Sequence, residues 1–346
     1  MVPLDILDRD TIHPVLPATN PEGCLEGCSK PRRPRRRGAR ENLTQKRSYA
    51  CAPAPLSSIF SPKIHGESVE EVGARGGGFT LANAVETRAE HHLGDEDQIQ
   101  VYVNGVVFDH VTSLKAAEVS RRILGLRGRI VLKHSVGVPI GVGLGTSASL
   151  ALTTILALFR ITGRGISLMS ACRLVHEIEI GCGTGLNSEA GFLSSGLILV
   201  LEAGAPPRLK IDSIPLPRDS LLIVIAASPV EKQRVLGRGD LEEIKEIGDR
   251  KIGEILENPT PENFLEKSRE FALEAGLATK RVQEIFEELA RLPVIGYAQN
   301  MIGEACHALA LRRDAETIVK TLREVFPEYF VRMFEVGGLV GSFIEI

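Results

Sequence analysis

The chain has 346 residues, 43% of them hydrophobic and 25% charged, and its net charge is −3. This length is enough for a large buried core and for two domains, and the near balance of charge gives no general attraction to nucleic acid. No apolar run is long enough to cross a membrane, and the six cysteines lack the spacing of a metal site, so we expect free thiols in a reducing cytoplasm.

The first predicted segment, residues 1–46, is a basic tail. It contains the run KPRRPRRRGAR at 30–40, several prolines and no apolar period, a composition typical of chains without a fixed fold. It lacks the apolar core of a secretory signal, and its acids at 5, 8 and 10 do not suit a transit peptide. A nucleic-acid-binding arm, a targeting segment and an extension from a misassigned start codon all stay open, and we favour a disordered tail without function.

The folded part is predicted to begin with a strand at 48–52, which Pro53 and Pro55 would end. Four glycines at 73–78 predict a flexible loop. The residues that follow, 79–90, fit either a strand or the start of a helix.

Hydrophobic periodicity predicts the remaining elements. The expected strands are at 129–138, 196–204 and 219–228, with a hairpin at 98–109 that turns at Asn104-Gly105 and two strands at 329–346 around Gly337-Gly338. The expected helices are at 113–126, 149–161, 167–180, 300–313 and 315–326, with a charged helical stretch at 238–291. Strands and helices mix without regular βαβ spacing, so the predicted class is α+β.

A glycine-rich loop lies between the strand that ends at 138 and the helix that follows it. Because the first N–H groups of a helix have no partner and the helix dipole is positive there, this place suits an anion. Gly141, Gly143 and Gly145 would let the backbone come close to that anion. Thr146 and Ser147 could add hydroxyl contacts or hold a metal-bound water. The alternative is a tight turn capped by Ser or Thr.

The two best-known phosphate loops do not fit this stretch. A Walker A loop needs Gly-Lys-Ser/Thr, and the loop has no lysine. A Rossmann fingerprint needs Gly-x-Gly-x-x-Gly and an acid roughly 20 residues later. Here the third glycine comes one residue early, and 160–170 contains no Asp or Glu.

The pattern Pro139-x-Gly-x-Gly-Leu-Gly-x-Ser147 resembles the ATP-phosphate loop of the GHMP kinases. Four further stretches resemble motifs of archaeal pantoate kinases within that superfamily. They are APAPLSSIF at 52–60, GARGGG at 73–78, the series from HEIEIGCGTGL to EAGAP at 176–206, and AQNMIGEACHAL at 298–309. The chain from about residue 48 onward is therefore identified as a divergent relative of that family.

The resemblance implies a two-domain GHMP kinase fold, with an N-terminal α/β domain over 47–206 and a ferredoxin-like C-terminal domain over 207–346. It also implies ATP and Mg²⁺ as cofactors and pantoate as the acceptor, in archaeal coenzyme A synthesis. A GHMP kinase with another small acceptor and an inactive ATP-binding regulator are the alternatives. Dimers are common among such kinases, so a homodimer is a further expectation.

The resemblance also implies the site residues, and for each of them an ordinary turn, cap or surface role is the alternative. The expected nucleotide-binding residues are Pro139, Gly141, Gly143, Leu144, Gly145, Thr146, Ser147 and Ala148. Ser147 and Glu179 are expected to hold Mg²⁺ and, with Ser188, to serve catalysis. The expected acceptor-binding residues are Ser57, Ser58, Arg75, Thr184 and Gly185.

Four positions depart from the family pattern. Ser188 stands where the family has a loop aspartate, Pro55 replaces a histidine, Ala74 a serine and Val200 an arginine. A lost general base costs about 10²–10⁴-fold in rate. Glu189 is no automatic substitute, because neighbouring residues of a helix point about 100° apart. Homoserine kinases resemble this fold and work without such a base, so positioning and metal could suffice.

Overall fold

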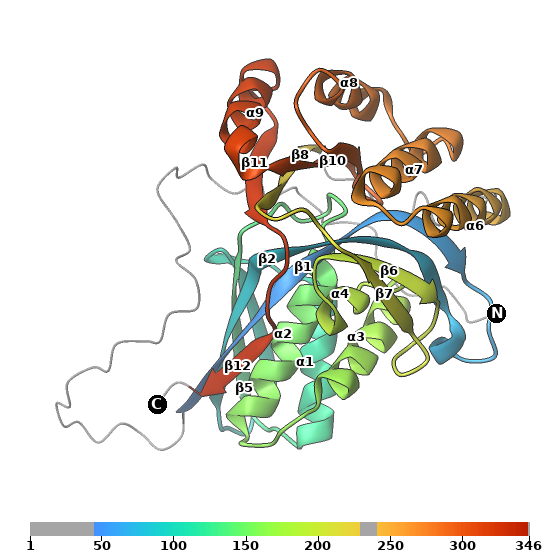
Figure 1. The fold of residues 1–346 in the computed structure, drawn as a ribbon. Coiled ribbons are helices and arrows are strands. Elements are labelled where there is room, and N and C mark those ends of the chain that lie inside the picture. The colour runs from blue at the N-terminus through green and yellow to red at the C-terminus, as the bar shows by residue number, and fades with distance from the viewer. Residues whose placement is uncertain (1–44, 229–240, 345–346) are drawn as a thin grey trace.

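The computed structural model describes residues 45–228 and 241–344, so nearly all of the basic tail expected at 1–46 lies outside the described residues. Within the described ranges, the chain forms two sheets that are each packed against helices (Figure 1). This arrangement confirms the α+β class.

The larger sheet has the strand order β12-β1-β2-β5-β3-β4, and β6 and β7 extend it from β2. All its strand pairs are antiparallel except β3 with β5, which is parallel. The strands are β1 (Gln45–Lys63), β2 (Gly73–His92), β3 (Gln98–Val103), β4 (Val106–Val107), β5 (Arg129–Val136), β6 (Leu197–Glu202), β7 (Lys210–Ile214) and β12 (Gly341–Ile344). The helices below it in Figure 1 are α1 (Val111–Leu124), α2 (Thr146–Ile161), α3 (Leu168–Cys182) and α4 (Ala190–Leu193), and a 3₁₀ turn, η1 (Val69–Glu71), precedes β2.

The smaller sheet is antiparallel, in the order β11-β8-β10-β9. Its strands are β8 (Ser220–Ser228), β9 (Gly296–Gln299), β10 (Glu304–Leu311) and β11 (Phe330–Glu335). The helices of this part are α6 (Leu241–Glu257), α7 (Pro261–Glu274), α8 (Lys280–Leu289) and α9 (Arg312–Val325). Helices α6 and α7 also contact β1 of the larger sheet.

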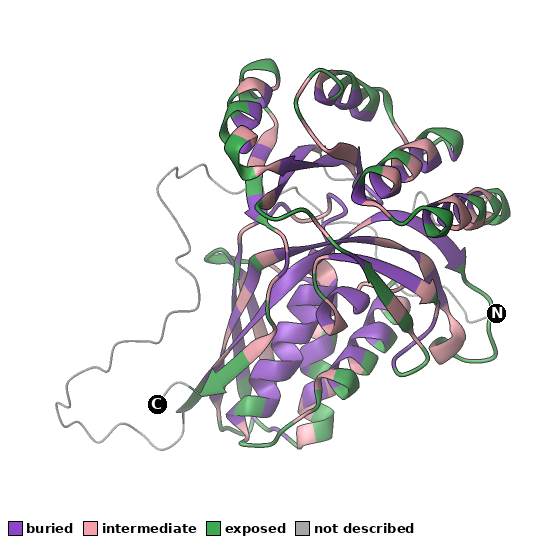
Figure 2. Ribbon diagram, in the orientation of Figure 1, coloured by how far each residue is buried: buried purple, intermediate pink, exposed green. Residues whose placement is uncertain are grey.

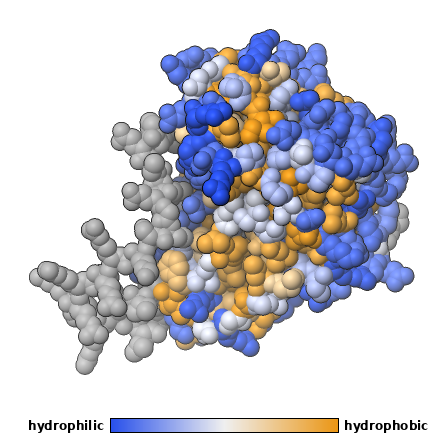
Figure 3. Space-filling model, viewed as in Figure 1, coloured by the Kyte–Doolittle hydropathy of each residue, from blue (hydrophilic) through white to orange (hydrophobic). Residues whose placement is uncertain are grey.

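The core is continuous between the two sheets. Leu56 and Phe79 of the larger sheet belong to the same buried cluster as Leu222 and Leu309 of the smaller one. Helix α2 is buried almost throughout, whereas the outer helices α6 to α9 bury one side only (Figure 2). Polar residues accordingly cover the helices at the upper right of the molecule, and apolar residues form a band across its centre (Figure 3).

Two expectations for the first strands are wrong. β1 does not end at the prolines but continues to Lys63, because Pro53 lies in a register shift between Ala52 and Ala54, where no ladder hydrogen bond is required. The glycines at 73–78 are not a flexible loop but part of β2. A Cβ at Gly76 or Gly78 would collide with carbonyl oxygens of β1, so glycine is needed there for close strand approach.

The helix expected at 300–313 is also wrong, since most of this stretch is strand β10. β10 pairs with β8 on one side and β9 on the other, and its residues from Ala305 to Ala310 are all buried. A strand that is covered on both faces shows no alternation of apolar and polar residues, so its alanine-rich sequence resembles a buried helix.

The two strands expected at 329–346 are confirmed as β11 and β12, but they pair in different sheets, β11 with β8 and β12 with β1. β7 likewise pairs with β6 in the larger sheet. The division of the chain at residues 206 and 207 stays a prediction.

The remaining local expectations are confirmed by α1, α2, α3, α9, the β3–β4 hairpin, and α6 to α8 within 241–291, and residues 238–240 lie outside the described part. Among the described helices, none has the length and apolar character needed to span a membrane. The described cysteines, Cys51, Cys172, Cys182 and Cys306, are free thiols.

Candidate active site

The glycine-rich loop between β5 and α2 has a conformation that depends on its glycines. Gly141, Gly143 and Gly145 have φ angles of 84°, 77° and 60°, a region that residues with a side chain rarely adopt. A Cβ on Gly145 would also collide with the carbonyl of Pro55, and one on Gly143 would lie 2.8 Å from the carbonyl oxygen of Asn300. The loop is therefore packed between β1 and the turn that precedes β10.

The amides of this loop are available to a ligand. Within residues 45–228 and 241–344, no hydrogen-bond partner is found for the N–H groups of 140–148. The first backbone bond of α2 runs from the Ser149 N–H to the Gly145 carbonyl, at 3.3 Å. Unpaired amides at the N-terminus of a long helix, with the positive end of its dipole, form a binding place for an anion.

Ser147 lies in the first turn of α2 and is half-buried. Its carbonyl accepts a hydrogen bond from the Thr112 hydroxyl at 2.8 Å, which joins α1 to the start of α2. Its own hydroxyl has no hydrogen bond to any described residue, so it is free to bind a ligand or a metal ion.

Glu179 projects from α3 into the interior. It is 2% exposed, whereas Glu177 on the same helix is exposed. Glu179 Oε1 accepts a hydrogen bond from the Thr184 hydroxyl at 3.0 Å, and its Oε2 has no partner among the described residues. A Cβ on Gly185 would collide with Oε2, so glycine at 185 leaves that oxygen room. A buried carboxylate oxygen without a partner suits a hard cation, and the residues present therefore fit Mg²⁺.

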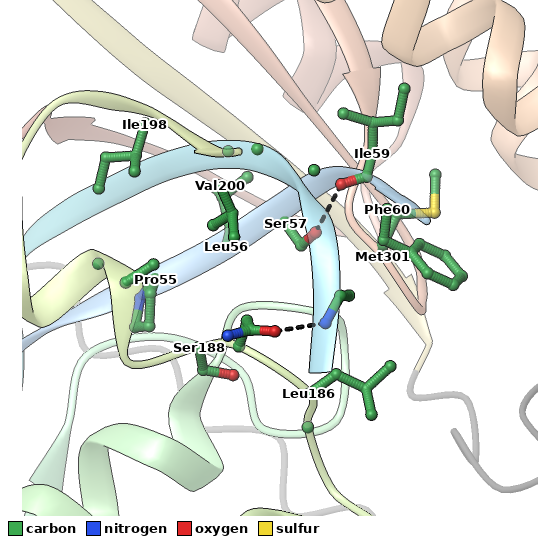
Figure 4. A pocket seen from close by; sticks show the side chains of 18 of the residues that line it. Pro55, Leu56, Ser57, Ile59, Phe60, Leu186, Ser188, Ile198, Val200 and Met301 are labelled. Atoms are coloured by element: carbon green, nitrogen blue, oxygen red, sulfur yellow. Dashed lines mark hydrogen bonds between the residues drawn. The ribbon is translucent and has the colours of Figure 1, made fainter. Parts of the chain in front are cut away.

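A cavity of about 120 Å³ lies beside the loop that follows α3. It is lined by residues of β1, β2, the 184–191 segment, β6 and the turn before β10, including Ser57, Thr184, Gly185, Ser188 and Met301 (Figure 4). Pro55 belongs both to its wall and to the packing of Gly145. The cavity and the glycine-rich loop are therefore neighbours.

All four positions that depart from the family pattern line this one cavity. Pro55, Ala74, Ser188 and Val200 come from four separate segments of the chain and meet in its wall (Figure 4). The departures therefore alter one binding surface, and the cavity is more apolar than the family motif predicts.

The comparisons with known proteins agree with this geometry. The family described as GHMP kinases N terminal domain matches residues 111–193. The pantoate kinase of Thermococcus kodakarensis is 26% identical over 300 residues, which cover 84% of this chain and 99% of the relative. The pantoate kinase of Methanospirillum hungatei is 25% identical over 288 residues, 81% of this chain and 92% of the relative.

Solved structures show the same fold. A phosphotransferase related to the CoA biosynthesis pathway has a TM-score of 0.76 at 24% identity and covers 86% of this chain and 98% of its own. MDDEF in complex with MVAPP, AMPPCP and magnesium has a TM-score of 0.64 at 13% identity, with coverage of 87% and 99%. The chain has the fold of the GHMP kinases.

Arg75 is the one charged residue among the described residues that line the cavity. Its Nη1 donates to Asp249 Oδ1 at 2.7 Å and its Nε to the Leu201 carbonyl at 3.1 Å. Its Nη2 has no partner in the described part of the chain. Burial would raise the pKa of Asp249, but hydrogen bonds from Ser61 and Lys245 and the nearby positive charges hold that pKa below its ordinary value. Asp249 therefore stays ionised and keeps Arg75 in place.

The side chains of Ser57 and Ser58, both on β1, point in different directions. Ser57 lines the cavity, and its hydroxyl donates to the Ile59 carbonyl at 3.3 Å (Figure 4). Ser58 is fully buried, does not line the cavity, and bonds through its hydroxyl to His307 Nε2 at 2.9 Å. Of the two serines expected to bind the acceptor, only Ser57 therefore faces the cavity, and its role in acceptor binding stays a prediction.

A buried pair that sequence reasoning missed anchors the 184–189 loop. His176 Nδ1 lies 2.6 Å from Glu189 Oε1, and His176 Nε2 donates to the Val69 carbonyl at 3.1 Å. Burial lowers the pKa of His176, but the hydrogen bond and charge of Glu189 outweigh it and raise that pKa overall. Burial also raises the pKa of Glu189. The pair therefore shares a proton, and Glu189, which does not line the cavity, holds the loop rather than facing the acceptor.

Asn187 gives this loop a second anchor. Its Oδ1 accepts from the Ala74 N–H, and its Nδ2 donates to the Gly204 carbonyl at 3.1 Å. The loop that presents Ser188 to the cavity is thus bonded on both sides. The sequence signal for the other anchor, the His176–Glu189 pair, was only that the two residues lie thirteen positions apart. That spacing alone does not show that their side chains meet.

Proposed function

We propose that this chain transfers the γ-phosphoryl group of ATP to the primary hydroxyl of pantoate and so produces 4-phosphopantoate for coenzyme A synthesis. The observation that carries the proposal is the cavity beside an anion-binding loop of unpaired amides, in a chain whose pantoate kinase relatives align over more than four fifths of its length. Phosphoryl transfer depends mainly on positioning and electrostatic stabilisation, and such a site supplies both.

The loop over 139–148 is the proposed triphosphate site. Each hydrogen bond to a charged group is worth about 1.5–3 kcal/mol, so several amides together hold a triphosphate firmly. The Ser147 hydroxyl and Glu179 Oε2 are the proposed ligands of Mg²⁺, which would neutralise phosphate charge during transfer.

The cavity is the proposed acceptor site. Pantoate has a carboxylate at one end, a primary hydroxyl at the other and two methyl groups between them. Arg75 Nη2 is the proposed partner of the carboxylate, and Ile198 and Val200, which line the cavity, are the proposed apolar wall for the methyl groups. Ser57, Thr184, Gly185 and Ser188 then surround the hydroxyl.

No acidic residue lies among the described residues of the cavity wall. The acceptor hydroxyl therefore reacts without a side-chain base, and the chain's contribution is to hold acceptor and phosphate in line. A general base adds about 10²–10⁴-fold, so we expect turnover to be slow for a kinase of this class.

The test is turnover of ATP with Mg²⁺ and, in parallel, pantoate, homoserine or mevalonate, with the product identified by mass spectrometry. Formation of 4-phosphopantoate in preference to the other products supports the proposal. Turnover of another acceptor would reassign the substrate, and nucleotide binding without turnover of any acceptor would favour a regulatory protein.

A further inference from the structure

In the turn between β9 and β10, the side-chain NH2 group of Asn300 is buried and has no hydrogen-bond acceptor among the described residues. Asn300 is fully buried. Its Oδ1 lies 2.7 Å from His307 Nδ1, but its Nδ2 has no partner among the described residues. A buried donor that stays unpaired costs about 1–3 kcal/mol, so the unpaired Asn300 amide calls for an explanation, and an acceptor that arrives with a ligand would supply one.

This turn separates the two halves of the site. On one side, the Asn300 carbonyl oxygen and Cβ would lie 2.8 Å and 3.0 Å from a Cβ on Gly143 of the phosphate loop. On the other side, Met301 and Ile302 line the acceptor cavity (Figure 4). The Met301 N–H also donates to the Ser57 carbonyl at 2.7 Å, which fixes the turn to β1. The group that passes from nucleotide to acceptor must cross this boundary.

A chain of hydrogen bonds orients the amide. Burial lowers the pKa of His307 to about 3, so its ring is neutral and has one N–H and one acceptor nitrogen. Because Asn300 Oδ1 can only accept, Nδ1 carries the proton, and Nε2 accepts from the Ser58 hydroxyl at 2.9 Å. The ring is further held by an edge contact with Phe79, 5.5 Å between centroids. Asn300 Nδ2 is therefore turned away from His307.

We propose that the Asn300 amide donates to the γ-phosphoryl oxygens of bound ATP, and that His307 and Ser58 are positioning residues for it. The proposal rests on nucleotide binding at the glycine-rich loop but not on the identity of the acceptor. A fixed donor beside the transferring group would stabilise the charge that spreads over its oxygens.

The test compares the dissociation constants of AMPPCP and ADP, both with Mg²⁺, by titration calorimetry on the full chain. Asn300→Asp keeps the oxygen that accepts from His307 and replaces the donor by an anion. We expect AMPPCP to bind about 10- to 100-fold more weakly, the size of one hydrogen bond to a charged group, with little change for ADP. Asn300→Ala should also weaken the binding of AMPPCP more than that of ADP, without the charge repulsion that aspartate adds. Ser58→Ala should weaken AMPPCP binding in the same selective way but to a smaller extent.

Asn263→Asp is the matched control, since the Asn263 amide donates to the Glu254 and Asn258 carbonyls and to no ligand. Both nucleotides should bind this variant as they bind the unmodified chain. If both Asn300 variants bind AMPPCP and ADP equally more weakly, or if their affinities for both nucleotides are unchanged, the proposed role of Asn300 is overturned. The proposed function of the chain would not be affected by that result. An unmodified chain that binds neither nucleotide would overturn the proposed function together with this inference.

Discussion

Replacement of Glu179 by glutamine should stabilise the ligand-free protein and at the same time abolish turnover. Glu179 is 2% exposed, and its Oε2 has no partner in the described residues. Glutamine keeps the shape of the side chain and the Oε1 acceptor of the Thr184 hydroxyl but removes the buried charge. An unpaired buried charge costs more than an unpaired neutral group, so we expect the free energy of unfolding to rise by about 1–2 kcal/mol.

The assay is thermal unfolding with and without Mg²⁺ and AMPPCP. Each kcal/mol shifts Tm by roughly 2–4 °C in a domain of about 150–250 residues and by less in a longer chain such as this one, so Glu179→Gln should melt measurably higher than the unmodified chain when no ligand is present. Mg²⁺ with AMPPCP should raise Tm of the unmodified chain but have much less effect on the variant, since a metal ligand is lost.

Glu177→Gln is the control for this experiment. Glu177 is exposed on the same helix and pairs only with Arg173 at 3.4 Å among the described residues, so Tm and turnover should both stay near their original values. A Glu179→Gln variant that melts lower than the unmodified chain, or that keeps its full response to Mg²⁺, would refute the reasoning.

Three further outcomes are expected. Ser188→Asp should place a base in the cavity wall and raise kcat for pantoate by about 10²-fold or more, and an unchanged kcat in steady-state assays would contradict a missing base. Arg75→Met should raise KM for pantoate about 10- to 100-fold and leave KM for ATP unchanged. Arg208→Met, which breaks an exposed ion pair with Glu71, is the control and should change neither KM. If Arg75→Met and the unmodified chain have the same KM for pantoate, Arg75 does not bind the carboxylate. Between His176 and Glu189 the folded chain retains a proton that the unfolded chain releases, because both pKa values are raised. The stability from this pair is therefore complete below the ordinary histidine pKa of 6.5 and is lost as pH rises through the raised value, so urea unfolding at increasing pH should show a decline that Glu189→Gln removes.

The glycine-rich loop between β5 and α2 shows how much the local sequence can predict. Three glycines between a strand and a helix predicted an anion-binding place, and each of the three has the left-handed backbone that such a loop requires. The predicted strand, loop and helix are confirmed because strand, turn and helix preferences all act within a few residues, whereas anion binding at this loop stays a prediction. The same reasoning failed at β10, where burial on both faces removed the pattern that distinguishes a strand from a helix.

The candidate site was predicted only as a set of separate motifs. The sequence indicated Glu179 and Arg75 as site residues. It did not show that Glu179 is buried or that Arg75 is hydrogen-bonded to Asp249 on α6. It also could not show that Ser58 points inward, since the direction of a strand residue follows from which sheet face is covered.

By itself, the sequence determined most of the helices and strands and the glycine spacing of the loop before α2, because these depend on preferences between near neighbours. Only the tertiary structure decided that four divergent positions share one cavity, that His176 meets Glu189, and that the amide of Asn300 lies beside Gly143. Such contacts join residues far apart in the chain. They form only when burial of the common core of the two sheets brings those segments together.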